Sequence, residues 1–94
     1  MTSYHHVDIT SNIETITKAI GEPIYYAPNN TDEKVQVEWE IKLPNGNEVY
    51  LYAWKEYRPL NETTYIDFHV GARDKAESIE ARKFINSAID KSRK

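Results

Sequence analysis

The sequence of 94 residues has no cysteine, only three glycines and no long apolar run. The absence of cysteine excludes a disulfide framework, a thiolate nucleophile and zinc-finger chemistry. None of the glycines forms a loop that could cradle phosphate. The longest apolar run, residues 49–54, is far shorter than the roughly 20 residues of a membrane helix. Residues 1–8 lack the basic and apolar regions of a secretory signal, so we expect a cytoplasmic protein.

The residues that are present describe one small globular domain. The chain is 39% hydrophobic and 29% charged, with two Trp, seven Tyr, two Phe and a net charge of −3. This length supports one hydrophobic core and no second. Residues 1–94 are therefore predicted to form a single domain, in which residues 1–9, without a periodic pattern, are a loose lead-in.

Two helices are predicted from their capping signals. Ser11 and Glu14 have the spacing of a capping box, isoleucines follow at helical spacing, and Gly21 suits the end of this helix. Asp74 and Glu77 give the same signal before a C-terminal helix. The buried stripe of that second helix is predicted to consist of Ala81, Phe84, Ile85 and Ala88.

Strands are predicted between the helices. Residues 35–43 alternate apolar and polar side chains without exception, residues 64–70 alternate in the same way, and residues 24–26 are a short extended piece. The predicted fold is α+β: a helix, a three- to four-stranded antiparallel meander and a helix, with both helices in a single layer on one sheet face.

The turn between residues 43 and 47 decides which side chains share a face. A two-residue Asn-Gly turn would pair Leu43 with Glu48. A type I turn with Pro44 at its second position and Gly46 as a left-handed bulge pairs Leu43 with Asn47 instead. We favour the bulged turn, because proline prefers that position and the resulting pairs match apolar to apolar side chains.

In this register, the sheet face that points away from Trp39 is aromatic and acidic. Tyr50, Tyr52 and Trp54 lie on it, and neighbouring strands add further residues, namely Glu38, Glu40, Tyr65, Asp67 and His69. So much aromatic surface favours a partner-binding site, at which Trp39 is buried and Trp54 exposed. The alternative is that a helix, or the N-terminal segment with Tyr4, covers the face and makes these aromatics core.

Charge is divided unevenly along the chain. Residues 1–70 hold eleven acids and five bases, whereas residues 71–94 hold four acids and seven bases. An acidic sheet favours a basic partner. The basic C-terminal helix has a simpler explanation, since bases near a helix C-terminus complement its dipole.

Signals for catalysis or metal binding are weak. His5 and His6 are adjacent, which does not match ligand spacing, so no metal or cofactor is predicted. Asp67 and His69 could form an acid–base pair, yet no side chain is an obvious nucleophile beside them. A hydrolase built on this pair is our third hypothesis, after binding functions.

Two resemblances bear on function. The helix–strands–helix order resembles a double-stranded-RNA-binding domain, but residues 71–77 carry two acids where that domain has its lysine cluster, so we expect no nucleic-acid partner. Four short motifs within residues 22–72, namely Glu22-Pro23, residues 37–41, residues 52–55 and residues 68–72, resemble a group of small bacteriophage proteins. Their pattern is Trp-x-Ile, an Asp-Gly turn, Tyr-Asp-Trp-Lys and Trp-His-Ile-Gly-Gly. This chain departs from it at Asn45, Ala53, Phe68 and Ala72.

The resemblance implies a phage accessory protein in the cytoplasm of the host cell. The favoured function is non-enzymatic binding of a basic host protein, as an antagonist of host defence, with a homo-oligomer as a further option. The alternative is a protein that sequesters a small ligand or nucleotide signal by stacking its base on Tyr50, Tyr52, Trp54 and His69.

Overall fold

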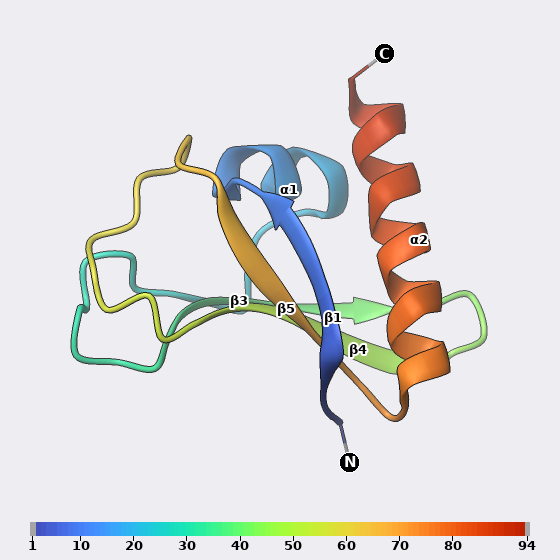
Figure 1. Cartoon of the computed structure of the whole chain (residues 1–94). Helices are drawn as coiled ribbons and strands as arrows, with labels where there is room; N and C mark the ends of the chain where they lie inside the picture. The colour runs from blue at the N-terminus through green and yellow to red at the C-terminus, as the bar shows by residue number, and fades with distance from the viewer. Residues whose placement is uncertain (1, 94) are drawn as a thin grey trace.

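The computed structural model describes residues 2–93 and shows an α+β fold, as predicted (Figure 1). Five antiparallel strands form one sheet in the order β1-β5-β4-β3-β2. The sheet therefore has more strands than the three or four predicted. The elements in chain order are β1 (Ser3–Ser11), α1 (Ile13–Ile20), β2 (Tyr25–Tyr26), β3 (Val35–Lys42), β4 (Glu48–Trp54), β5 (Ile66–Ala72) and α2 (Lys75–Ser92).

The N-terminal segment is a strand, so the prediction of a loose lead-in over residues 1–9 was wrong. β1 pairs with β5 along the edge of the sheet and buries Val7 and Ile9. Its register shifts between Tyr4 and Asp8, and His6 has a positive φ of 63°. This irregularity breaks the two-residue alternation by which a strand is recognised in a sequence.

The helix ends follow local capping chemistry. The N-cap of α1 is Asn12, whose side chain accepts a hydrogen bond from the amide of Thr15, and not Ser11, which is buried at the end of β1. α1 ends at Gly21, with φ of 102°, as predicted. The predicted cap of α2 is also confirmed, since Asp74 accepts from the amide of Glu77.

The hairpin between β3 and β4 has the predicted bulged turn. Trp39 lies opposite Leu51, Gly46 has φ of 91°, and its amide donates to the carbonyl oxygen of Leu43 at 2.8 Å. At the other end of β3 the register shifts, which turns Gln36 inward, although the alternation predicted it on the solvent face. Its amide group donates to the backbone carbonyls of Pro28 at 3.0 Å and Arg58 at 2.7 Å.

The core lies between the helices and one face of the sheet. Both helices lie on the same side of β3 and β4 (Figure 1). Trp39 is 2% exposed, and its ring meets the ring of Phe68 edge-on with the centroids 5.7 Å apart. α2 contributes Ala81 and Ile85 to the core as predicted, whereas Phe84 is 37% exposed at the margin of the buried stripe. None of the helices within residues 2–93 is apolar and long enough to span a membrane.

Candidate functional site

The sheet face turned away from the helices carries a continuous row of polar and aromatic side chains. One residue from each strand lies in this row, because the registers place them opposite one another: Tyr25, Glu38, Tyr52, His69 and Asp8. Glu40 and Tyr50 are paired on one side of the row, and Asp67 and Thr10 are paired on the other. We call this surface the aromatic–acidic face, and its members are Tyr4, Asp8, Tyr25, Glu38, Glu40, Tyr50, Tyr52, Trp54, Asp67 and His69.

Two residues of β1, Tyr4 and Asp8, join the residues predicted for this face. The ring of Tyr4 stacks on the ring of His69, with the centroids 3.7 Å apart. The hydroxyl of Tyr4 donates to the Asp8 carboxylate at 2.9 Å, and Asp8 Oδ1 lies 3.7 Å from Nε2 of His69. The sequence signal for Asp8 is its place between two apolar residues, Val7 and Ile9, which is the alternation of a half-buried strand.

Three rings form a cluster at the centre of the face. Tyr52 meets Trp54 with ring centroids 6.1 Å apart and meets His69 at 5.6 Å, and Trp54 lies 6.3 Å from His69. Tyr52 and His69 are half-buried, whereas Trp54 is 37% exposed. The predicted contrast between a buried Trp39 and an exposed Trp54 is confirmed. The N-terminal strand covers part of the face, as the alternative interpretation proposed, and leaves Trp54 open.

Tyr65 and Asp67 differ from their predicted setting. Tyr65 precedes β5 and is 58% exposed, without a ring contact to the described aromatics. Asp67 accepts a hydrogen bond from the hydroxyl of Thr10. The carboxylate that lies beside Nε2 of His69 is therefore that of Asp8, and within residues 2–93 no hydrogen bond links Asp67 to His69.

The acids of the face differ in burial, since Asp8 and Glu38 are half-buried whereas Glu40 and Asp67 are exposed. Burial raises the pKa of the Glu38 carboxyl. A hydrogen bond with Glu48, together with repulsion from it, raises the pKa of Glu40. The charge of Glu40 in turn raises the pKa of Tyr50. The pKa shifts of Glu40 and Tyr50 reflect repulsion among neighbouring carboxylates, whereas the shift of Glu38 reflects burial alone. A bound cation would stabilise the ionised form of either glutamate.

His69 behaves differently. Burial lowers its pKa, and the nearby carboxylates of Asp8 and Asp67 oppose this effect without cancelling it. The neutral imidazole is therefore favoured in the folded protein. Among residues 2–93, no three His, Cys, Asp or Glu side chains are grouped so that they could hold a metal ion.

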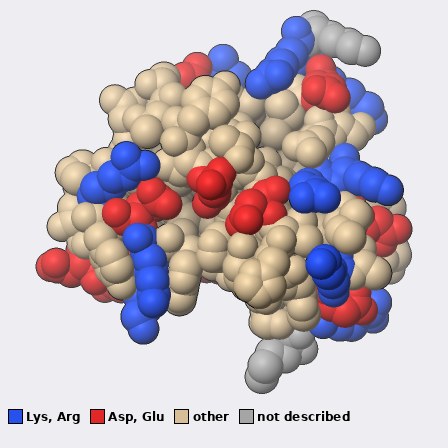
Figure 2. Space-filling model, in the orientation of Figure 1, with Lys and Arg blue, Asp and Glu red and all other residues tan. Residues whose placement is uncertain are grey.

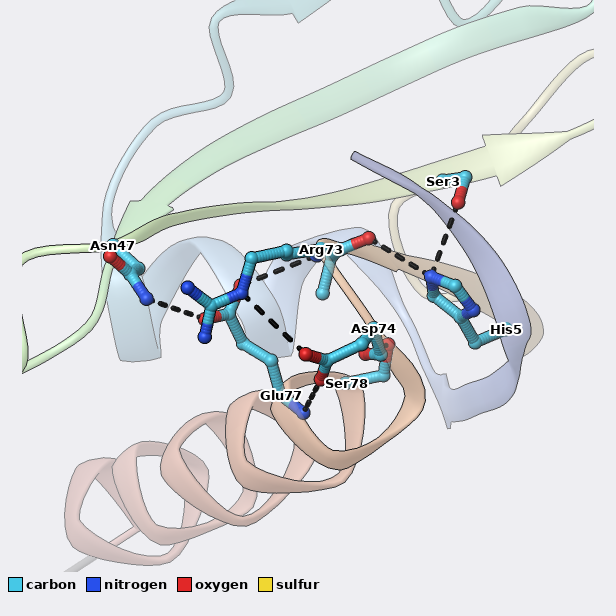
Figure 3. Close-up of polar contacts among 8 residues, drawn as sticks. Ser3, His5, Asn47, Arg73, Asp74, Glu77 and Ser78 are labelled. Carbon is cyan, nitrogen blue, oxygen red and sulfur yellow. Dashed lines mark hydrogen bonds and ion pairs between the residues drawn. The ribbon is translucent and has the colours of Figure 1, made fainter. Parts of the chain in front are cut away.

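A second polar cluster lies outside the face, where α2 begins (Figure 3). Glu77 is 4% exposed, and its Oε2 accepts from the side-chain amide of Asn47 at 2.7 Å. Arg73 donates to Glu77 through its backbone amide at 3.3 Å and forms an ion pair with it. This cluster joins the β3–β4 turn to the first turn of α2, so it is satisfied internally and we assign it a structural role.

Comparisons with known proteins identify no relative whose function could be compared with the aromatic–acidic face. No protein-family model, no curated protein and no solved structure matches this chain. The face combines aromatic rings with four carboxylates, and among residues 2–93 none of these carboxylates forms an ion pair with a lysine or arginine. This arrangement is suited to binding, because rings supply apolar contact area and the carboxylates select for positive charge.

Proposed function

We propose that this protein is a non-enzymatic binding protein whose aromatic–acidic face holds a basic segment of a protein partner. The observation that supports this most directly is the row from Asp8 to Tyr25, which runs across all five strands on the face that the helices leave open. Tyrosine and tryptophan are enriched at protein interfaces, and they contribute most to binding where the surrounding contacts exclude water.

The charge of the face favours a basic protein over an anionic ligand. Its acids are Asp8, Glu38, Glu40 and Asp67, and one base, Lys55, lies beside it with its Nζ 5.5 Å from the centroid of the Trp54 ring. Several other basic side chains lie over the part of the surface that α2 occupies (Figure 2). A nucleotide stacked on Tyr52 and Trp54 would bring its phosphates close to these carboxylates, and like charges repel. The arrangement therefore supports the alternative of a nucleotide-sequestering protein less well.

We further propose that the partner is a protein of a bacterial host and that binding inhibits it. The support for this part is the resemblance of residues 22–72 to small bacteriophage proteins, together with the acidic character of the face. Expression of the chain in a phage-restricting bacterial strain tests it. Restored plaque formation, lost on Trp54→Ala and kept with Phe84→Ala, is the expected result, and unchanged restriction with the wild-type chain would contradict it.

Binding itself can be tested with two matched variants. Trp54 and Phe84 are both 37% exposed, but only Trp54 lies on the aromatic–acidic face. We expect a lysine- and arginine-rich peptide to shift the amide resonances of β4 and β5 in NMR spectra. Trp54→Ala should weaken its binding at least fivefold, and Phe84→Ala less than twofold.

Three outcomes would contradict the proposal. The first is that the basic peptide shifts no resonance of the face. The second is that adenosine monophosphate binds the face more tightly than the peptide does, which would favour a nucleotide site. The third is a stable dimer in sedimentation that dissociates on Trp54→Ala, because a second copy of the chain would then be the occupant.

A further inference from the structure

The aromatic–acidic face is indented at Gly71, the one position of its rows without a side chain. Gly71 lies opposite Tyr50 on β4 and Tyr4 on β1. A hollow of about 390 Å³ opens there, and its lining residues are Thr2, Ser3, Glu38, Tyr50, Tyr52 and Gly71. A Cβ atom added to Gly71 would lie 3.3 Å from Cε1 of Tyr52. The lack of a side chain at Gly71 therefore leaves space for the Tyr52 ring.

The lining of the hollow suits a cation with a flat apolar surface. Tyr50 and Tyr52 are among its lining residues, and tyrosine rings attract ammonium and guanidinium groups. Glu38 supplies a half-buried carboxylate that forms no hydrogen bond or ion pair through its side chain within residues 2–93. Burial raises the pKa of this carboxyl, and a cation placed beside it would reverse that effect.

We propose that this hollow is the specificity pocket for an arginine side chain of the basic partner; the inference rests on the function proposed above. Arginine fits better than lysine for two reasons. Its guanidinium is planar and stacks on aromatic rings, and its paired N–H groups match the two oxygens of a carboxylate. The ammonium of lysine is strongly hydrated and offers neither the flat surface nor the paired geometry.

The chain offers a matched pair of variants for the test. Glu38 and Glu40 lie two residues apart on β3 and face the same side, but only Glu38 lines the hollow. The probe is the peptide Gly-Gly-Arg-Gly-Gly with blocked termini, compared with the same peptide carrying lysine or citrulline. Binding is followed by the NMR shifts of the amides of Tyr50, Tyr52 and Gly71.

We expect the arginine peptide to bind at least threefold more tightly than the lysine peptide, and the citrulline peptide not to bind. Glu38→Gln should weaken arginine binding at least tenfold, whereas Glu40→Gln, which removes a charge of the face outside the hollow, should weaken it only two- to fourfold. Gly71→Ala should also weaken it, because the added methyl group displaces the Tyr52 ring and alters the hollow without a change of charge. Should Gly71→Ala fail to fold, the two glutamate variants still decide the question.

Different results would contradict the arginine pocket and the proposed function of the face. Equal losses in Glu38→Gln and Glu40→Gln, or equal binding of the lysine and arginine peptides, would overturn the pocket and leave the face as a general acidic docking surface. A longer arginine-rich peptide that shifts no resonance anywhere on the face would overturn the pocket and the proposed function together.

Discussion

The ring of Tyr4 lies parallel to the ring of His69, with the centroids 3.7 Å apart and the planes inclined by only 8°. Tyr4 precedes the irregular part of β1, and His69 lies in the middle of β5. The stack therefore attaches the first residues of the chain to the sheet beyond the point where the regular pairing is interrupted. It also covers one side of the imidazole and contributes to its burial.

Replacement of Tyr4 should loosen the N-terminal strand. Stacked aromatic pairs contribute ~0.5–1.5 kcal/mol, so we expect Tyr4→Ala to lower the free energy of unfolding in urea by about 1 kcal/mol. Amide exchange of residues 3–7 should accelerate at the same time. Tyr4→Phe keeps the stack but loses the hydrogen bond to Asp8, and its effect should be smaller. Equal effects of the two variants would show that the hydroxyl, and not the stack, holds the strand.

His69 should make the protein less stable in mild acid. Its pKa is lowered from the ordinary value of 6.5 in the folded protein, so the unfolded chain binds a proton more readily. Stability linked to this group is complete above pH 6.5 and decreases as the pH falls below that value. The pH dependence of unfolding in urea should be steeper for the wild type than for His69→Gln, by less than about 1.4 kcal/mol per pH unit, the limit for one proton. An NMR titration of the imidazole with its midpoint above 6.5 would contradict this prediction.

The hairpin from β3 to β4 shows what the sequence could predict. Pro44 and Gly46 determine the turn through their own backbone preferences, and the turn determines the register that buries Trp39 and exposes Trp54. Every step of that inference uses residues close together in the chain. The register of the hairpin and the composition of the β3 and β4 part of the face were therefore predictable.

The parts that were not predicted depend on partners distant in sequence. β1 pairs with a strand near the other end of the chain, and its irregular register between Tyr4 and Asp8 hides the alternation. Gln36 turns inward because the loops at Pro28 and Arg58 offer it carbonyl groups. Such pairings depend on tertiary packing, which a local pattern does not encode.

The buried Glu77 should be essential for the junction between the β3–β4 turn and α2. Glu77→Ala leaves the amide of Asn47 without its acceptor and Arg73 without its ion-pair partner, so we expect a loss of about 2 kcal/mol or more in the free energy of unfolding. Asn47→Ala alone should cost about 1 kcal/mol. The double variant should be less destabilised than the two losses combined, by at least about 0.5 kcal/mol, because both changes remove the same bond. Additive losses in urea unfolding would show that the two side chains are not coupled.

Glu38 should oppose folding while it supports binding. Burial raises its pKa above the ordinary 4.5, so its ionised form is less stable in the folded protein than in the unfolded chain. The destabilisation is therefore absent well below pH 4.5 and grows as the pH rises through the folded pKa. Glu38→Gln removes the charge but keeps the shape, so at pH 7 we expect it to raise the free energy of unfolding, by no more than about 1 kcal/mol because solvent still reaches the carboxylate.

Glu38→Gln should also bind the arginine peptide more weakly than the wild type does. Higher stability together with weaker binding distinguishes a binding role of Glu38 from a structural one. A residue that serves only the fold destabilises the protein when it is replaced, and any loss of binding then follows from the loss of structure. Here stability and binding should change in opposite directions, which urea unfolding at pH 7 and pH 4 and the NMR titration measure separately. If Glu38→Gln unfolds more easily than the wild type at pH 7, the carboxylate stabilises the sheet and its role is structural.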